Sequence, residues 1–361
     1  MKILFLTSIP SPYRVEFFNE LGKKTDLTVL FETSGSDERD NSWREYCFTY
    51  FRGIIMKGKK SSVNTAFCPE VIRYLRQSWD HIIVADVSTP TGMLAIQYMK
   101  FHHIPYWIEG DGAFAKSGKG IKERIKRHFI YGAKGYFSTS KAHDEYYLTY
   151  GASLNRIFRY PFTSIHEEDV LVNPLGVKEK ARLRAELGMT ERPTVISVGQ
   201  MIPRKGFDIL IRAAAQCKNT VFYIIGGTPP KKYTELKQAL CAENVQFVEF
   251  KKPKELKRYY QAADLFILPT REDIWGLVIN EAMANALPVI TTDRCVAGLE
   301  LVRNGENGYI VPVEDVSATV EAIEKVLAAD TDKMSARSLN VIRDYTIESM
   351  AEAHVRILNG K

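Results

Sequence analysis

Residues 268–288 read LPTREDIWGLVINEAMANALP: an apolar strand ends at Leu268, a charged loop follows, and a helix begins after Gly276. Backbone N–H groups at the start of a helix lack intrahelical partners, and together with the helix dipole they form a seat for a phosphate. A strand, a loop and a helix in this order are the unit from which doubly wound parallel sheets are built. This stretch therefore predicts an α/β fold that can hold an anion.

The same alternation extends along the chain. Short apolar runs rich in β-branched residues, typical of buried parallel strands, alternate with segments of helical period. The predicted strands cover residues 3–6, 27–31, 82–85, 106–108, 136–139, 194–198, 221–225, 245–250, 265–268, 289–291 and 309–311. The predicted helices cover residues 15–21, 70–77, 91–100, 121–131, 141–150, 208–216, 233–242, 255–262, 277–284 and 317–328.

These elements predict two Rossmann-like, doubly wound domains that face each other across an interdomain cleft. The length of 361 residues suits two domains. Residues 162–176 lack a clear period, so we place an N-terminal domain at 1–165 and a second domain at 166–345. Residues 346–361 are predicted to form a C-terminal helix that packs back on the first domain.

Composition narrows the class of protein. Hydrophobic residues make up 45% and charged residues 25%, as in ordinary globular chains. No apolar run reaches the length of a signal peptide or a membrane span, and five scattered cysteines lack metal or redox spacing. We therefore expect a reduced, cytoplasmic protein. Up to Ile165 there are 23 Lys+Arg against 16 Asp+Glu, so the first half meets an anionic partner or carries a solubilising surface.

Two acidic residues flank the predicted phosphate seat. Asp273 lies in the loop before it, and Glu281 lies about 7.5 Å along the helix after it, at 1.5 Å per residue. Carboxylates there could bind sugar hydroxyls on both sides of a diphosphate. The alternative is that Asp273 caps the helix and Glu281 belongs to a solvated face.

Residues 195–210, VISVGQMIPRKGFDIL, supply cations at the end of another strand. The strand runs into Gly199, and the loop delivers Arg204 and Lys205 before the next helix. The pair could clamp a diphosphate and neutralise the charge that grows as a sugar–phosphate bond breaks. The alternative is that Arg204 and Lys205 are simply two exposed residues in a surface turn and bind no ligand.

Three segments resemble glycosyltransferase family four, the retaining nucleotide-sugar transferases of the GT-B fold. They are IWGLVINEAMANALPVI (274–290), VGQMIPRKGFDILIRA (198–213) and NGENGYIVP (304–312). In the first half, SPYRVEFFNEL (11–21) is similar to a bacterial polysaccharide-biosynthesis branch of that family. The resemblance implies a nucleotide-sugar donor and a lipid-linked or oligosaccharide acceptor.

By this resemblance Asp273 holds the donor sugar, with Glu272 sharing the task, and Glu281 holds the nucleotide ribose. The family's first phosphate cation is replaced by Gln200, so Arg204 is expected to assist Lys205. The resemblance places further donor contacts at Gly199, Gly226, Gly276 and the backbone of Leu277 and Val278.

In the first domain, WIEGDG (107–112) puts Glu109 where many members have a histidine near the reacting sugar, with Asp111 beside it. Either carboxylate could accept a proton from the attacking hydroxyl or orient the sugar, or both could simply form a turn. Tyr13 and Arg14 in the first loop are expected to touch the acceptor.

The segment IKERIKRHFIY (121–131), preceded by Lys116 and Lys119, combines an apolar stripe with basic residues. The stripe, Ile121, Ile125 and Phe129, is expected to face the core, and contact with the inner face of an anionic membrane is the alternative.

Together these features predict a retaining, metal-independent hexosyltransferase that uses UDP-sugar to build a bacterial surface polysaccharide or glycolipid. No cofactor or nucleic-acid partner is expected, because protein cations cover the diphosphate. Asp330 and Asp332 follow a helix and make a poor metal site. A nucleotide-sugar 2-epimerase of the same fold and a non-catalytic protein that binds lipid or polyanion remain as alternatives.

Overall fold

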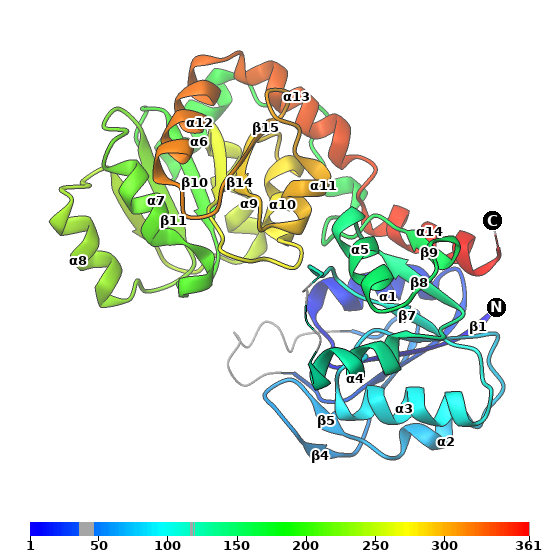
Figure 1. Cartoon of the computed structure of the whole chain (residues 1–361). Coiled ribbons are helices and arrows are strands. Elements are labelled where there is room, and N and C mark those ends of the chain that lie inside the picture. Colours follow the sequence, from blue (N-terminus) through cyan, green and yellow to red (C-terminus); the bar gives the residue numbers. More distant parts are fainter. Residues whose placement is uncertain (36–46, 116–117, 119, 361) are drawn as a thin grey trace. The chain divides into compact units, whose positions relative to one another are not determined.

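The computed structural model describes residues 1–35, 47–115, 118 and 120–360 (Figure 1). The chain divides into two compact units, one of Met1–Ser164 with Thr346–Lys361 and one of Ile165–Tyr345. This division falls one residue before the expected boundary. Each unit contains one main sheet of parallel strands, so the prediction of two doubly wound α/β domains is confirmed. Within the described ranges, no helix has the length and apolar composition needed to cross a membrane.

The first unit is built on a seven-stranded sheet in the order β3-β2-β1-β6-β7-β8-β9. Its strands are β1 (Lys2–Thr7), β2 (Asp26–Phe31), β3 (Arg52–Ile55), β6 (His81–Val84), β7 (Trp107–Glu109), β8 (Gly135–Ser138) and β9 (Ile157–Arg159). The strand order reverses between β1 and β6, and open sheets bind ligands outside the carboxyl ends of the strands at such a point.

Helices cover both faces of this sheet: α1 (Pro12–Gly22), α2 (Val71–Leu75), α3 (Pro90–Phe101), α4 (Ile121–Ile130), α5 (Lys141–Thr149) and α14 (Ile347–Leu358). Alternate residues of β1 point to opposite faces. Leu4 belongs to the core shared with α2, α3 and α5, whereas the ring of Phe5 lies 4.8 Å from that of Phe18 in α1. Helix α14 packs against α1 (Figure 1).

Some short strands of this unit were not predicted from the sequence. The edge strands β3 and β9 are only partly buried and therefore lack a continuous apolar run. A small antiparallel pair, β4 (Lys59–Lys60) with β5 (Ala66–Phe67), was likewise not predicted.

The second unit has a six-stranded parallel sheet in the order β12-β11-β10-β13-β14-β15. Its strands are β10 (Thr194–Val198), β11 (Val221–Ile225), β12 (Val245–Val248), β13 (Leu265–Leu268), β14 (Val289–Thr292) and β15 (Gly308–Val311). Its helices are α6 (Val177–Glu186), α7 (Phe207–Ala214), α8 (Lys231–Ala239), α9 (Pro253–Ala262), α10 (Leu277–Ala284), α11 (Val296–Leu301), α12 (Val316–Ala328) and α13 (Thr331–Ile342). Helices α6 and α11 were not predicted from the sequence.

The Asp-x-Asp pair of this unit has a structural explanation. Asp330 is the N-cap of α13, and its side chain accepts a hydrogen bond from the Lys333 N–H at 3.2 Å. Among the described residues, no group of three or more His, Cys, Asp or Glu side chains is arranged to hold a metal ion.

Candidate active site

Two glycines bring the carboxyl ends of β10 and β11 close together in the second unit. A Cβ atom on Gly226 would lie 1.8 Å from the main-chain oxygen of Gly199, and the Gly199 N–H donates to Ile225 O at 3.0 Å. A side chain at Gly226 would therefore force the two strand ends apart. Both glycines lie at the edge of the sheet where the nucleotide was expected.

The side chain of Lys205 lies against Gly199. Its Cε atom is 3.4 Å from the position that a Cβ on Gly199 would take. The following residue, Gly206, has φ +70°, and a Cβ there would lie 1.9 Å from Pro269 O. Glycine lets this turn adopt a left-handed conformation and approach the loop after β13, where the Lys205 Nζ lies 2.6 Å from Asp273 Oδ2.

Arg204 joins the same group from a more exposed position. Its Nη1 donates to the main-chain oxygen of Glu272 at 2.7 Å and lies 3.4 Å from Asp273 Oδ1. Its own main-chain oxygen accepts hydrogen bonds from Arg271 N–H and Thr270 Oγ1. The structure thus brings together the two cations and the acidic loop that the sequence had singled out separately.

The alternative role of Asp273 as a helix cap is wrong. Gly276, with φ +104°, occupies the N-cap position of α10, and Asp273 instead forms ion pairs with both cations. A Cβ on Gly276 would lie 2.9 Å from Cys295 Sγ, so a larger residue would be crowded as well as strained. Leu277 and Val278 open the helix, where N–H groups and the helix dipole favour an anion.

Glu281 is half-buried in α10, so the alternative of a solvated face is also wrong. Its Oε2 accepts a hydrogen bond from the Tyr260 hydroxyl of α9 at 2.9 Å. Burial raises the pKa of Glu281 above its usual value, although the bond from Tyr260 and the charge of Lys205 oppose the change. The carboxylate is therefore held in one orientation by a neighbouring helix.

In the first unit, Glu109 is 1% exposed and lies in a buried ion cluster, formed by Arg14, Glu109, Asp111 and His354. Its Oε1 pairs with the Arg14 guanidinium and accepts a hydrogen bond from Tyr160 at 3.2 Å, and its Oε2 lies 3.0 Å from His354 Nε2. Burial alone would raise the pKa of Glu109, but Arg14 and His354 outweigh it and lower the pKa from 4.5 to about 2.

These surroundings correct two expectations. Glu109 is a poor proton acceptor for a substrate hydroxyl, because it is buried, ion-paired and a weak base. Arg14 is 4% exposed, and its guanidinium pairs with both Glu109 and Asp111. It is therefore not available to contact an acceptor. Tyr13 donates to Asp111 Oδ2 at 2.9 Å, and the Asp111 side chain remains 28% exposed.

His354 is the member of the cluster that sequence reasoning missed. Its Nδ1 lies 2.8 Å from the Met350 carbonyl oxygen, and its Nε2 faces Glu109. The ring therefore joins the Met350 carbonyl of its own helix to the Glu109 carboxylate. His354 thus ties α14 to β7, and Arg14 ties α1 to the same strand.

Another carboxylate missed by the sequence analysis, Asp86, follows β6 at the point where the strand order of the first sheet reverses. Its Oδ2 accepts from the Ser8 N–H at 2.7 Å and from Thr7 Oγ1 at 3.2 Å. Burial raises the pKa of Asp86. The signal available in the sequence was its place directly after a buried apolar run.

Comparison with known families bears on the second unit. Residues 179–340 match the family model described as "Glycosyl transferases group 1". The match covers a little less than half of the chain and shows that the second unit is similar to glycosyltransferase group 1 domains. The matched range contains Arg204, Lys205, Asp273 and Glu281.

Curated relatives resemble the same part of the chain. A GDP-mannose-dependent alpha-(1-6)-phosphatidylinositol monomannoside mannosyltransferase of Mycolicibacterium smegmatis is 34% identical over 165 residues, which are 41% of this chain and 42% of the relative. A D-inositol 3-phosphate glycosyltransferase of Mycobacterium sp. is 35% identical over 159 residues, 42% of this chain and 36% of the relative. The chain spans about two fifths of the length of the curated relatives it matches.

Solved structures match the whole chain. Anabaena Alr3699/HepE in complex with UDP aligns over 100% of both chains with a TM-score of 0.80 at 18% identity. Sucrose-phosphate synthase from Thermosynechococcus elongatus aligns over 99% of this chain and 98% of its own with a TM-score of 0.77 at 19% identity. At such identities the likeness shows the fold alone, which is the GT-B fold.

Proposed function

We propose that this protein is a retaining glycosyltransferase that moves a sugar from a nucleoside-diphosphate sugar, with UDP favoured, to an acceptor hydroxyl. The observation that carries the proposal is the meeting of Arg204, Lys205 and Asp273 at the loop that leads into α10. Two fixed cations beside a helix N-terminus form a site for a diphosphate. Support for the donor class comes from the GDP-mannose-dependent relative and the UDP complex of HepE.

The leaving diphosphate gains negative charge as the sugar departs. Lys205, Arg204 and the N–H groups of Leu277 and Val278 would meet that charge, and losing one preorganised group of this kind commonly costs about 3–4 kcal/mol of barrier. Asp273 holds the Lys205 ammonium before the donor binds and then stands beside the sugar. Because the protein supplies the cations, the reaction is expected to proceed without a metal ion, and full turnover in EDTA is the matching test.

Glu281 would bind the hydroxyls of the nucleotide ribose. An acceptor-only carboxylate suits the two donors of a ribose, and Tyr260 presents it in one orientation. Glu272 takes part through its main chain, since its carbonyl oxygen holds Arg204.

The acceptor side of the proposal rests on the first sheet. Asp86 and the partly exposed Asp111 follow neighbouring strands, β6 and β7, at the carboxyl edge. Carboxylates in this position can orient the hydroxyl of an acceptor sugar or lipid-linked sugar. We propose that they replace Glu109 in the role first given to it, in assembly of a glycolipid or polysaccharide.

Contact with an anionic membrane surface would bring a lipid-linked acceptor to the enzyme. The expectation that the stripe of α4 faces the core is wrong for its first half, because Ile121 is 76% and Ile125 43% exposed. Phe129 packs against the core. Lys122 and Lys126 follow these isoleucines on the helix, whereas Lys116 and Lys119 lie outside the described residues. An exposed apolar and basic face suits an anionic lipid surface.

Calorimetry with UDP and GDP tests the donor site directly. Lys205→Met should weaken binding of the preferred diphosphate at least tenfold, about 1.4 kcal/mol. Lys231→Met in α8 is the matched control, because its ammonium is highly exposed and pairs across the helix surface with Glu235. Equal binding by wild type and Lys205→Met would contradict the proposal, and an isomerised sugar after incubation with donor alone would identify an epimerase instead.

A further inference from the structure

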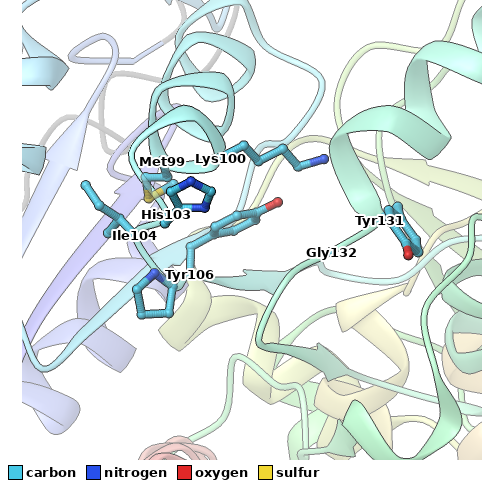
Figure 2. A pocket seen from close by; sticks show the side chains of 8 residues that line it. Met99, Lys100, His103, Ile104, Tyr106, Tyr131 and Gly132 are labelled. Carbon is cyan, nitrogen blue, oxygen red and sulfur yellow. The ribbon is translucent and has the colours of Figure 1, made fainter.

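A pocket of about 390 Å³ lies in the first unit at the amino end of β7 (Figure 2). Its walls come from the end of α3, the turn that leads into β7, and the segment after α4. Glu109 ends the same strand at its opposite, carboxyl end, and Asp111 follows it. The pocket is therefore separate from the polar edge of the first sheet, and its volume is in the range of small-molecule sites.

Tyr106 forms part of the pocket and carries an unexplained polar group. The residue is 2% exposed, and its buried hydroxyl has no hydrogen-bond partner among the residues that the structure describes. Figure 2 shows its ring reaching toward the side where Tyr131 and Gly132 lie, with Lys100 running alongside. By contrast, the hydroxyl of Tyr136 on the adjacent strand donates to Ile130 O at 2.8 Å. Buried polar groups are nearly always paired, so a ligand is a natural partner for Tyr106.

The surroundings of this hydroxyl specify the charge of the ligand. Lys100 is half-buried and uses one of its three ammonium donors on the His128 carbonyl oxygen. The remaining walls combine Met99, Ile104, Pro105 and the ring of Tyr131 with the imidazole of His103. The Lys100 ammonium and the Tyr106 hydroxyl together match a group with one negative charge and two acceptor oxygens, which a carboxylate supplies.

We propose that this pocket binds a small monoanionic organic carboxylate, with its oxygens on the Tyr106 hydroxyl and the Lys100 ammonium. The apolar body of the ligand packs against Ile104 and Tyr131, above the buried side chain of Met99. The side chain of Lys100 moves from its place beside the Tyr106 ring to admit the carboxylate. This site is independent of the donor site in the second unit.

Binding of 2-naphthoate to the full chain tests the proposal, with neutral 2-naphthamide as the comparison ligand. Wild type should bind 2-naphthoate at least fivefold more tightly than the amide, measured by calorimetry and mapped to the Met99 methyl resonance by NMR. Tyr106→Phe and Lys100→Met should each remove that preference while UDP binding stays unchanged. No binding of 2-naphthoate, equal affinity for both ligands, or a preference that survives in both variants overturns the proposal.

Thermal unfolding separates the ligand role of the hydroxyl from a structural one. Tyr106→Phe breaks no hydrogen bond seen in the described structure, so its melting temperature should equal or exceed that of wild type. Tyr136→Phe is the matched control, because it loses the bond to Ile130 and should melt earlier while retaining the preference for 2-naphthoate. If Tyr106→Phe is destabilised as much as Tyr136→Phe, the hydroxyl has a partner in the protein and the proposal fails.

Discussion

Replacing Glu109 by Gln removes one charge from the buried ion cluster and leaves the other members in place. The folded-state pKa of Glu109 is about 2, against 4.5 as its usual value. At about 1.4 kcal/mol per unit, this difference corresponds to about 3 kcal/mol of stability at neutral pH. Removing one partner of a buried ion pair costs about 3–5 kcal/mol, which agrees, because the buried Arg14 guanidinium would lose the carboxylate of Glu109 and keep only Asp111.

The sign of the pH dependence follows from the lowered pKa. The contribution of Glu109 is fully present above pH 4.5 and is lost as the pH falls toward 2. The stability difference between wild type and Glu109→Gln should therefore be large at pH 7 and shrink as the pH is lowered below 4.5. Urea unfolding followed by tryptophan fluorescence measures this difference at each pH.

A matched control lies on the helix that carries His354. Glu352 pairs with Lys24 at 3.4 Å and is 68% exposed, so Glu352→Gln should change stability by less than about 1 kcal/mol. A Glu109→Gln protein as stable as Glu352→Gln at pH 7 would refute the assignment of Glu109 to the cluster. A folded Glu109→Gln protein that binds donor but has lost all turnover would restore its catalytic role.

Three further predictions concern the donor site. If Glu281 binds the ribose, wild type should bind 2′-deoxy-UDP more weakly than UDP by about 1 kcal/mol, and Glu281→Ala should bind both alike, as measured by calorimetry. Asp273→Asn releases Lys205 from its ion pair, so free UDP should bind as tightly or more tightly while sugar transfer falls; weaker UDP binding would contradict the pairing. Gly226→Ala places a methyl group 1.8 Å from Gly199 O and should lower stability by about 1–3 kcal/mol in thermal melts, whereas an unchanged melting temperature would mean that the strands are not so close.

The helices and central strands could be predicted because the pattern of apolar residues in each segment reflects which of its side chains are buried. Residues 265–268 form a strand with all four side chains buried, and residues 277–284 form the predicted helix with the same bounds. The edge strand β9 is partly exposed and lacks this local signal. The charged residues of the proposed donor site were chosen from their positions after strands and before helices, whereas the ion pairs of Asp273 with Arg204 and Lys205 were not predicted.

By itself the sequence determined the alternation of strands and helices and the placing of cations and carboxylates at strand ends, because periodicity and loop position are local properties. Only the tertiary structure decided what those charges do. Nothing in the sequence distinguishes the environments of Glu109 and Glu281. In the structure, Glu109 contacts Arg14 and His354, whereas Glu281 accepts a hydrogen bond from Tyr260. A carboxylate's ionisation and availability depend on its burial and its partners, and Glu109 acquires one of its partners from 245 positions away.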